Sequence, residues 1–329
     1  MACAPFTSRG TTYPEFRNYT MGVFEGKSIF IWNTPSIFDG NPQKIAALLR
    51  TGGFKTAIFK AAQGDFVFVP PIFPFARWMK KPNVSADLVQ ALHDVDIKVA
   101  GFGFCFGTDP EGEGTIAAQL VDSLNLDGWV WDVEDSFEIF INNDPDPGFE
   151  RAKRLIGSYV ENRTRTVPTT FCSWARWRDP RQNLDRPWHN VQMAGLFMAF
   201  CDYGMPMCYW SRFGYDGKPV KALPADATGL LAETIKQWAP VTDKPLIPVG
   251  RAYTGNGGFA MGTIATVFEA AVRANKMRGV SWWGLDWAKN IPEVWAALTR
   301  MPSAYHVELA AVPPATVGSG TGTPQSPAS

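Results

Sequence analysis

The feature that most constrains the fold is a regular alternation of short apolar segments with amphipathic helical ones. Eight segments rich in β-branched and aromatic residues are predicted strands: 28–33, 55–63, 97–104, 128–134, 168–174, 205–210, 245–251 and 279–286. The predicted helices between and after them are 42–51, 86–94, 115–124, 147–162, 188–201, 226–239, 263–276 and 291–298. Because each strand segment is almost continuously apolar, we expect parallel strands that are buried on both faces.

Eight such units predict an α/β protein consisting of a single (β/α)₈ TIM barrel, a fold that typically takes about 250 residues. A doubly wound open sheet is the main alternative, but no GxGxxG motif follows the first predicted strand. We expect an N-terminal arm over residues 1–27 and the barrel over 28–309. Residues 310–329 carry no charge and consist mostly of Pro, Gly, Ser, Thr and Ala, which predicts a flexible, disordered tail.

Composition excludes several classes of function. The 31 Lys and Arg residues balance 31 Asp and Glu residues, so no net charge attracts nucleic acid. The longest apolar run, 194–201, is far shorter than the roughly 18 residues of a membrane span. Residues 1–20 lack the apolar core of a signal peptide, so we expect synthesis in the cytoplasm. Five scattered cysteines and three histidines without ligand spacing predict no metal site, and we expect no cofactor.

Chemistry in a barrel of this kind lies at the carboxyl ends of the strands. In the fourth strand, DGWVWDVED, strand alternation places Asp132 and Glu134 on the same face. Two partly desolvated carboxylates that repel each other hold a proton near neutral pH, which is what a general acid needs. The alternatives are a pair of solvated acids or an ion pair with Arg176 or Arg251.

Aromatic residues are unusually abundant and several follow predicted strands. The chain has 13 Trp, 23 Phe and 8 Tyr residues. Aromatic rings at strand ends suit stacking against sugars, although filling a large core is the alternative explanation.

The stretch DGWVWDVE resembles the DGxDxDxE signature of glycoside hydrolase family 18, the chitinases and endo-β-N-acetylglucosaminidases, which are (β/α)₈ barrels. Val130 stands where that signature has its middle Asp. MPMCYW at 205–210 resembles the sixth strand of the family, whose Met and Tyr line the sugar site. GVSWWGLDW at 279–287 resembles the eighth strand, whose Trp forms the floor of that site.

A partial resemblance links the chain to the family 25 lysozymes of phages and bacteria. FKTAIFKAAQGDF at 54–66, followed by WDVE, is similar to the first half of those barrels, which carry a DxE on the corresponding strand. Those enzymes also use an Asp on the first strand, where this chain has Asn33. Both families act on β-1,4-linked sugars that bear an N-acetyl group.

The family 18 resemblance implies a role for each residue that it covers. Glu134 would protonate the glycosidic oxygen, and Asp132 would orient the substrate's own acetamido group as it attacks the anomeric carbon. Tyr209 would hydrogen-bond the acetamido carbonyl. Trp283 would stack beneath the sugar ring, although the strand phase leaves Trp282 open as an alternative.

Other residues at predicted strand ends are candidates for substrate binding. Asn33, Gln63 and Asp286 are candidates for hydrogen bonds to sugar hydroxyls, and Trp174 for a further aromatic contact; satisfaction by loop backbone is the alternative for the polar ones. Lys60 lies inside the second predicted strand, but no phosphate-binding Gly-rich loop accompanies it, which argues against Schiff-base chemistry.

The sequence thus favours a glycoside hydrolase that cleaves β-1,4 linkages in N-acetylated glycans such as peptidoglycan or chitin. The alternative is a catalytically degenerate barrel that binds glycans or serves as a structural module, such as a phage virion or surface-layer component. Its expected partner is a polysaccharide, with assembly into a virion or cell surface through the tail, or release by lysis, as further hypotheses. Nucleic acid and a membrane span are not expected.

Overall fold

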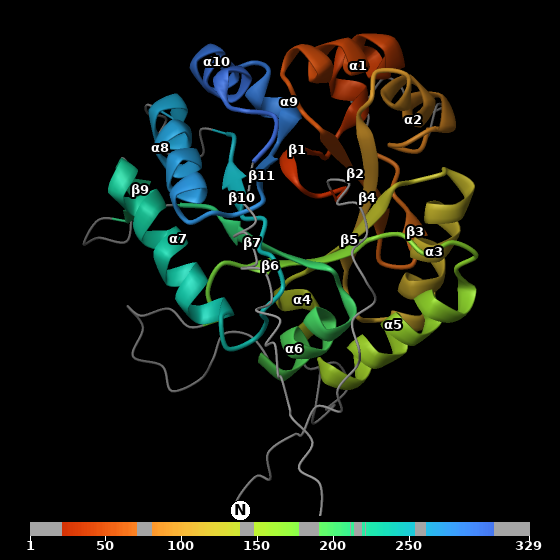
Figure 1. Cartoon of the computed structure of the whole chain (residues 1–329). Coiled ribbons are helices and arrows are strands. Elements are labelled where there is room, and N and C mark those ends of the chain that lie inside the picture. Colours follow the sequence, from red (N-terminus) through yellow and green to blue (C-terminus); the bar gives the residue numbers. More distant parts are fainter. Residues whose placement is uncertain are drawn as a thin grey trace, which may run out of the picture.

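A computed structural model describes residues 22–70, 81–138, 148–177, 191–210, 212–213, 219–220, 222–253 and 261–305. Eight parallel strands form the centre of the molecule: β1 (Gly26–Ile31), β2 (Thr56–Gln63), β4 (Lys98–Cys105), β5 (Gly128–Val133), β6 (Thr169–Trp174), β7 (Tyr203–Cys208), β10 (Val249–Arg251) and β11 (Gly279–Trp283). Each pairs with the next along the chain, and β11 pairs with β1, which closes the ring (Figure 1). The predicted (β/α)₈ barrel is confirmed.

Helices surround this ring on the outside (Figure 1). They are α1 (Pro42–Thr51), α2 (Ala86–His93), α3 (Pro110–Ser123), α5 (Phe149–Asn162), α6 (Val191–Phe200), α7 (Pro224–Trp238), α8 (Met261–Ala274) and α10 (Pro292–Arg300). As its position before the helix predicts, Ser85 caps α2, because its side chain accepts a hydrogen bond from the backbone N–H of Leu88.

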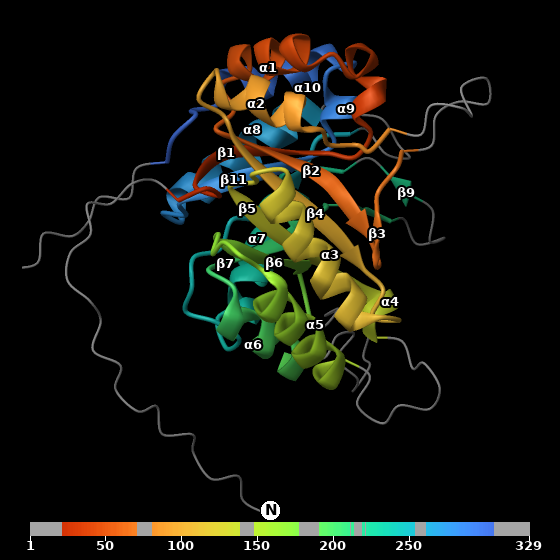
Figure 2. The same ribbon diagram turned by 90° about the vertical axis from the view of Figure 1, so that its right-hand side faces the viewer.

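Short helices and strands lie in the connections that follow the barrel strands. They are η1 (Thr34–Ser36), η2 (Phe38–Gly40), β3 (Phe66–Val67), α4 (Asp135–Glu138), β8 (Arg212–Phe213), β9 (Pro219–Val220) and α9 (Leu285–Ala288). β3 folds back antiparallel on β2 and lies at the same end of the barrel as α4, as the side view shows (Figure 2). That end is the carboxyl end of the barrel, since both elements directly follow strands.

Strand boundaries agree with the predicted ones to within two residues, except at two places. β10 begins at Val249 rather than at 245, because Pro248 has no N–H to donate to a neighbouring strand. β11 ends at Trp283 rather than at 286, because Gly284 adopts a left-handed conformation with φ of 99° and the chain turns into α9.

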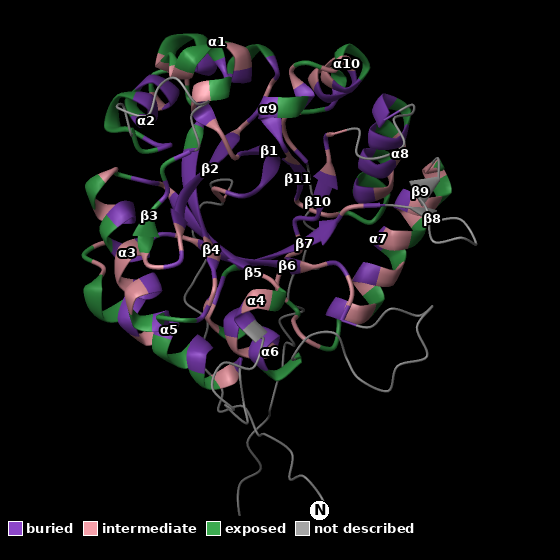
Figure 3. Cartoon of the chain, turned by 180° about the vertical axis from the view of Figure 1, so that it is seen from behind, coloured by how far each residue is buried: buried purple, intermediate pink, exposed green. Residues whose placement is uncertain are grey.

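The apolar core has an inner and an outer layer, and the strands between them are coloured as buried in Figure 3. The inner layer fills the barrel and includes Phe30, Ile58, Phe102, Val130, Cys172, Met205, Met207 and Val249. The outer layer lies between strands and helices and includes Trp129, Trp131, Phe171, Trp210, Phe268 and Trp282. Val130 and Trp131 therefore point to opposite sides of β5, as strand alternation predicts.

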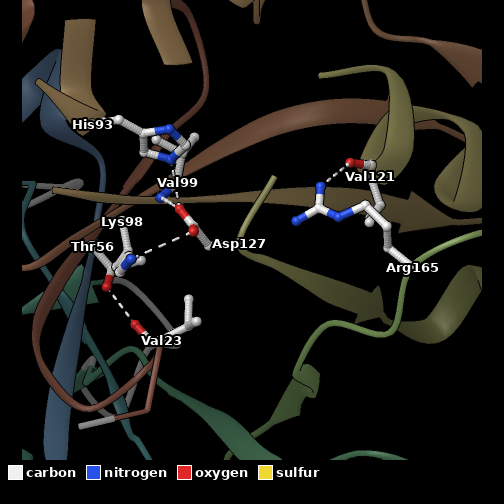
Figure 4. A network of polar contacts seen from close by, with 8 residues as sticks. All are labelled: Val23, Thr56, His93, Lys98, Val99, Val121, Asp127 and Arg165. Carbon is white, nitrogen blue, oxygen red and sulfur yellow. Dashed lines mark hydrogen bonds and ion pairs between the residues drawn. The ribbon is translucent and has the colours of Figure 1, made fainter. Parts of the chain in front are cut away.

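Polar groups at the amino ends of the strands are held by hydrogen bonds. Asp127, just before β5, accepts a hydrogen bond from the backbone N–H of Val99 at 2.8 Å through Oδ2 (Figure 4). The same oxygen lies 2.8 Å from Nε2 of His93, and the ammonium of Lys98 lies 3.7 Å from Oδ1. This network ties α2 and β4 to the start of β5.

Residues 22–25 precede β1 and cover the amino end of the barrel. Phe24 packs in the inner apolar layer, and Thr56 on β2 donates a hydrogen bond to the carbonyl of Val23. The rest of the predicted N-terminal arm, residues 1–21, and the whole predicted tail, 310–329, lie outside the described residues. None of the described helices is long and apolar enough to span a membrane.

Candidate active site

Asp132 and Glu134 lie at the carboxyl end of β5. Asp132 is buried, at 4% exposure, and its register neighbours are Phe104 on β4 and Cys172 on β6. Glu134 follows the last residue of the strand and is half-buried. The buried carboxyl therefore lies deeper in the barrel than the carboxyl that solvent and a substrate can reach.

The environment of Asp132 favours its protonated form. Burial raises the pKa of Asp132 well above its ordinary value, and the neighbouring charge of Glu134 raises it further. The positive charge of Lys60 acts in the opposite direction. Arg251, one of the two arginines predicted as an ion-pair alternative, donates from its guanidinium to the carbonyls of Trp210 and Tyr253 at 3.0 and 3.1 Å.

Lys60 is a site residue to which the sequence pattern assigned no role. It lies on β2 in register with Phe102, and its side chain is 8% exposed. Burial lowers its pKa, while the charges of Asp132 and Glu134 raise it. The one available signal was its position: Lys60 interrupts an apolar strand two residues after Ile58, which faces the barrel interior.

Aromatic residues from three further strands line the same end. Tyr209 follows β7, and its ring centroid lies 6.2 Å from that of Trp283 at the end of β11. Trp283 packs at 5.2 Å against Phe30 in the inner layer, whereas Trp282 lies in the outer layer against α8. Trp174 at the end of β6 also borders the inner layer. The alternative left open between Trp282 and Trp283 is thereby decided in favour of Trp283 as the residue that faces the barrel.

Three predicted site residues carry buried polar atoms without a hydrogen-bond partner among the described residues. They are Oδ1 of Asp132, Oη of Tyr209 and Oδ1 of Asn33. A buried polar atom without a partner costs free energy, about 1–3 kcal/mol, unless water or a ligand meets it. Burial raises the pKa of Tyr209 well above its ordinary value, so its hydroxyl stays protonated and is able to donate a hydrogen bond.

Gln63, Asn33 and Asp286 are dispersed around the carboxyl end. Gln63, the last residue of β2, is half-buried next to Phe104 in the strand register. Asn33 lies just before η1. It follows the inward-facing Phe30 by three residues, so strand alternation does not place it on the inward face. Asp286 lies in α9 rather than on a strand, and Oδ1 accepts a hydrogen bond from the backbone N–H of Trp32 at 3.4 Å. Burial raises the pKa of Asp286 to about 6.

Trp32 and Tyr253 were missed as site candidates, and Trp287, which follows the eighth predicted strand, was assigned no role. The rings of Trp32 and Trp287 stack with centroids 6.4 Å apart, and Trp287 is 43% exposed. Tyr253 lies 6.0 Å from Trp287 and 6.3 Å from Tyr209. Trp32 was detectable from the sequence, because it lies two residues after the inward-facing Phe30. These rings extend an aromatic surface from Trp283 toward solvent.

Within the described part of the chain, no group of three or more His, Cys, Asp and Glu side chains has an arrangement that could hold a metal ion. The described residues bring to this end of the barrel the carboxyls of Asp132, Glu134 and Asp286, the ammonium of Lys60, the hydroxyl of Tyr209 and several aromatic rings.

The fold is similar to that of solved glycoside hydrolases. These include a GH18 chitinase from Pseudoalteromonas aurantia (TM-score 0.54, 11% identity, 82% of this chain and 99% of that chain). They also include the endo-1,4-β-D-mannanase from Thermotoga petrophila (0.55, 10%, 79% and 88%) and the spore cortex-lytic enzyme SleL from Bacillus megaterium (0.50, 10%, 86% and 75%). No protein-family model and no curated protein matches the sequence. At these identities the likeness is one of fold.

Proposed function

We propose that this protein is a glycoside hydrolase that cleaves β-1,4 linkages in N-acetylated glycans, with peptidoglycan and chitin-type chains as the substrates. The observation that carries the proposal is the pair Asp132 and Glu134. One carboxyl is buried, the other is accessible, and both lie at the carboxyl end of a barrel strand. A buried pair that retains a proton is suited to general acid catalysis.

In the proposed mechanism the single proton of the Asp132–Glu134 pair passes to Glu134 when substrate binds, and Glu134 donates it to the glycosidic oxygen as the bond to the anomeric carbon breaks. The carbonyl oxygen of the substrate's acetamido group attacks the anomeric carbon, and Asp132 accepts a hydrogen bond from the acetamido N–H. The Tyr209 hydroxyl donates a hydrogen bond to the acetamido carbonyl oxygen, and Trp283 stacks beneath the sugar ring. The unpartnered Oδ1 of Asp132 and Oη of Tyr209 support these two roles.

The structural neighbours support a glycan as the substrate but do not agree on one sugar. One is a chitinase and another a spore cortex-lytic enzyme, whereas a third is a mannanase, whose name refers to a different sugar. Preference for an N-acetylated sugar therefore depends on the residues around Asp132 and on the family 18 signature that DGWVWDVE resembles.

The direct test measures glycan release from chitooligosaccharides and from peptidoglycan by the wild type and by Glu134→Gln. We expect turnover to fall at least about 10²-fold, the usual size of a lost general acid, with little change in the thermal midpoint. Asp135→Asn is the matched control, because it neutralises the exposed neighbouring carboxylate. Equal turnover in wild type and Glu134→Gln would remove Glu134 from the mechanism.

A second test concerns the nucleophile. If the acetamido group attacks, de-N-acetylated oligosaccharides bind but hardly react, and the first product formed is the β-anomer. NMR of the fresh product distinguishes this outcome from the α-anomer, which direct attack by water with inversion would form.

Val130 favours a second candidate function, a degenerate barrel that binds glycans without cleaving them. Val130 is fully buried in the inner layer, two residues before Asp132, where it cannot share a proton. In a degenerate barrel, Val130→Asp restores hydrolysis from near zero. In a catalyst adapted to valine, the added charge lowers activity or shifts its pH optimum. Attachment to a virion or cell surface through residues 310–329 belongs to this second proposal.

A further inference from the structure

Lys60 is the buried charged group at the carboxyl end that the mechanism above does not use. Its Nζ lies 4.5 Å from the ring centroid of Phe68, 5.6 Å from that of Phe104 and 5.8 Å from that of Trp32. Faces of aromatic rings attract a cation, so this cage favours the charged ammonium at a position where burial opposes it. Within the described part of the chain, no hydrogen bond or ion pair joins this ammonium to a protein oxygen.

The pairing of β2 with β4 is irregular next to Lys60. The parallel ladder between β2 and β4 shifts register between Lys60 and Ala62, so that one extra residue is accommodated on β2. A bulge of this kind changes the direction of the side chains that follow it. Ala61 and Ala62 both pack in the outer layer, and Lys60 is the last residue of β2 before this shift. Lys60 follows the inward-facing Ile58 by two residues, and through Phe102 on β4 it lies level in the strand register with Val130, the inward-facing residue two positions before Asp132.

The titratable groups around Asp132 come from five strands or their carboxyl ends. Glu134 just after β5 and Lys60 on β2 act on it directly. Cys105 on β4, Cys172 on β6 and Tyr209 after β7 all have pKa values raised well above their ordinary values by burial. These three groups therefore stay neutral across the range in which carboxyls titrate, and Lys60 is the cation among the described groups whose charge reaches Asp132.

We propose that Lys60 is a positioning residue of this site: its caged ammonium balances the negative charge of the Asp132–Glu134 pair and so holds the pair at a single proton. This inference rests on the proposed function for its catalytic meaning. Two carboxyls with one proton carry one negative charge, and one ammonium neutralises it. Without that ammonium the pair takes up a second proton at a higher pH, and Asp132 loses its ability to accept a hydrogen bond from the acetamido N–H.

The experiment compares wild type, Lys60→Met and Lys60→Arg by ¹³C NMR of carboxyl-labelled aspartate, with the Asp132 signal assigned by its absence in Asp132→Asn. In Lys60→Met we expect the titration midpoint of Asp132 to rise by about 1 pH unit or more, as loss of a nearby opposite charge does. In Lys60→Arg, which keeps the charge, the midpoint stays closer to that of the wild type. Lys98→Met is the matched control, because that ammonium pairs with Asp127 at the opposite end of the barrel.

Activity gives an independent readout. The acid limb of the pH profile of kcat/KM moves to higher pH in Lys60→Met and is rescued in Lys60→Arg. An unchanged midpoint and an unchanged profile in Lys60→Met would overturn the inference while leaving the proposed hydrolase intact. A raised midpoint in a protein that releases no glycan would uphold the charge balance and reject the hydrolase.

A reciprocal measurement covers the case in which Lys60→Met does not fold. The titration midpoint of Lys60, followed by ¹³Cε NMR of labelled lysine, is compared between wild type and Asp132→Asn. We expect the midpoint to fall in Asp132→Asn, because the charge of Asp132 raises the pKa of Lys60. An unchanged Lys60 midpoint would show that the two groups do not interact and would overturn the inference.

Discussion

Two aspartates of the same segment, Asp127 and Asp132, are separated by the length of β5 and have opposite environments. Asp127, at the amino end, meets a backbone N–H of Val99 and the ring of His93, both at 2.8 Å. Asp132, at the carboxyl end, is more deeply buried, and its Oδ1 has no hydrogen-bond partner among the described residues. The carboxylate before β5 is therefore hydrogen-bonded by the fold, whereas the buried carboxyl near the end of β5 has an oxygen that no described group meets.

β7 repeats this difference with tyrosines. Tyr203, the first residue of the strand, donates its hydroxyl to Oε1 of Glu25 at 3.3 Å. Tyr209, just after the strand, has a buried hydroxyl without a partner in the described part of the chain. In (β/α)₈ barrels the amino ends of the strands serve stability and the carboxyl ends serve function. We therefore expect substitutions at the two ends to change different quantities.

The largest effect on stability is expected for Asp127→Ala. It leaves the N–H of Val99 and the ring of His93 without their acceptor, which costs about 2 kcal/mol of unfolding free energy. Asp127→Asn, which keeps one acceptor oxygen, is expected to cost less. Urea unfolding measures both values, and glycan turnover per folded molecule stays at the wild-type level. A loss of turnover in the folded variant would contradict the separation of the two ends.

Asp132→Asn is expected to change stability in the opposite direction. The unfolding free energy of this variant is higher than that of the wild type near and above neutral pH. The folded-state pKa of Asp132 is raised, so the folded protein binds more protons than the unfolded one above pH 3.8. Its contribution to stability is therefore present at low pH and is lost as pH rises through the folded-state pKa. A folded-state pKa that lies one pH unit above the unfolded-state value corresponds to about 1.4 kcal/mol, so we expect a gain of at least about 1 kcal/mol.

Urea unfolding between pH 4 and pH 8 tests this difference. The gain of Asp132→Asn over the wild type grows as pH rises, while glycan turnover falls. Burial also raises the pKa of Glu113, to about 7, and that of Asp286, to about 6. Both groups therefore also lower the unfolding free energy as pH rises. Because both are present in wild type and variant alike, the comparison isolates Asp132. A gain that does not depend on pH would contradict the assignment.

The smallest effects are expected for the two tyrosines. Tyr203→Phe loses one buried hydrogen bond and costs about 1 kcal/mol of stability without changing turnover. Tyr209→Phe removes an unpartnered hydroxyl, so its stability stays within about 0.5 kcal/mol of the wild type while turnover falls. Thermal unfolding of the pair, with glycan release in parallel, measures both. Equal losses of stability would show that Tyr209 is held by the fold like Tyr203.

Local pattern was sufficient for the barrel and for the central pair of the candidate site. Alternation along DGWVWDVED predicted the inward face of Val130 and Asp132, because a strand with an apolar neighbour on each side has only two orientations. It was not sufficient where a strand ends. Asp286 was predicted to be a strand-end residue, but the left-handed turn at Gly284 moves it into α9 beside Trp32.

Other parts of the site depend on distances between segments that are remote in sequence. The sequence by itself determined the eight β/α units, the inward face of Val130 and Asp132, and the aromatic character of the strand ends, because these follow from local periodicity. Only the tertiary structure decided that Trp283 rather than Trp282 faces the barrel, and that Lys60 enters a cage made by Trp32, Phe68 and Phe104. The physical reason is closure: the curvature of the ring and the bulge in β2 decide which side chains meet, and neither is encoded in a single segment.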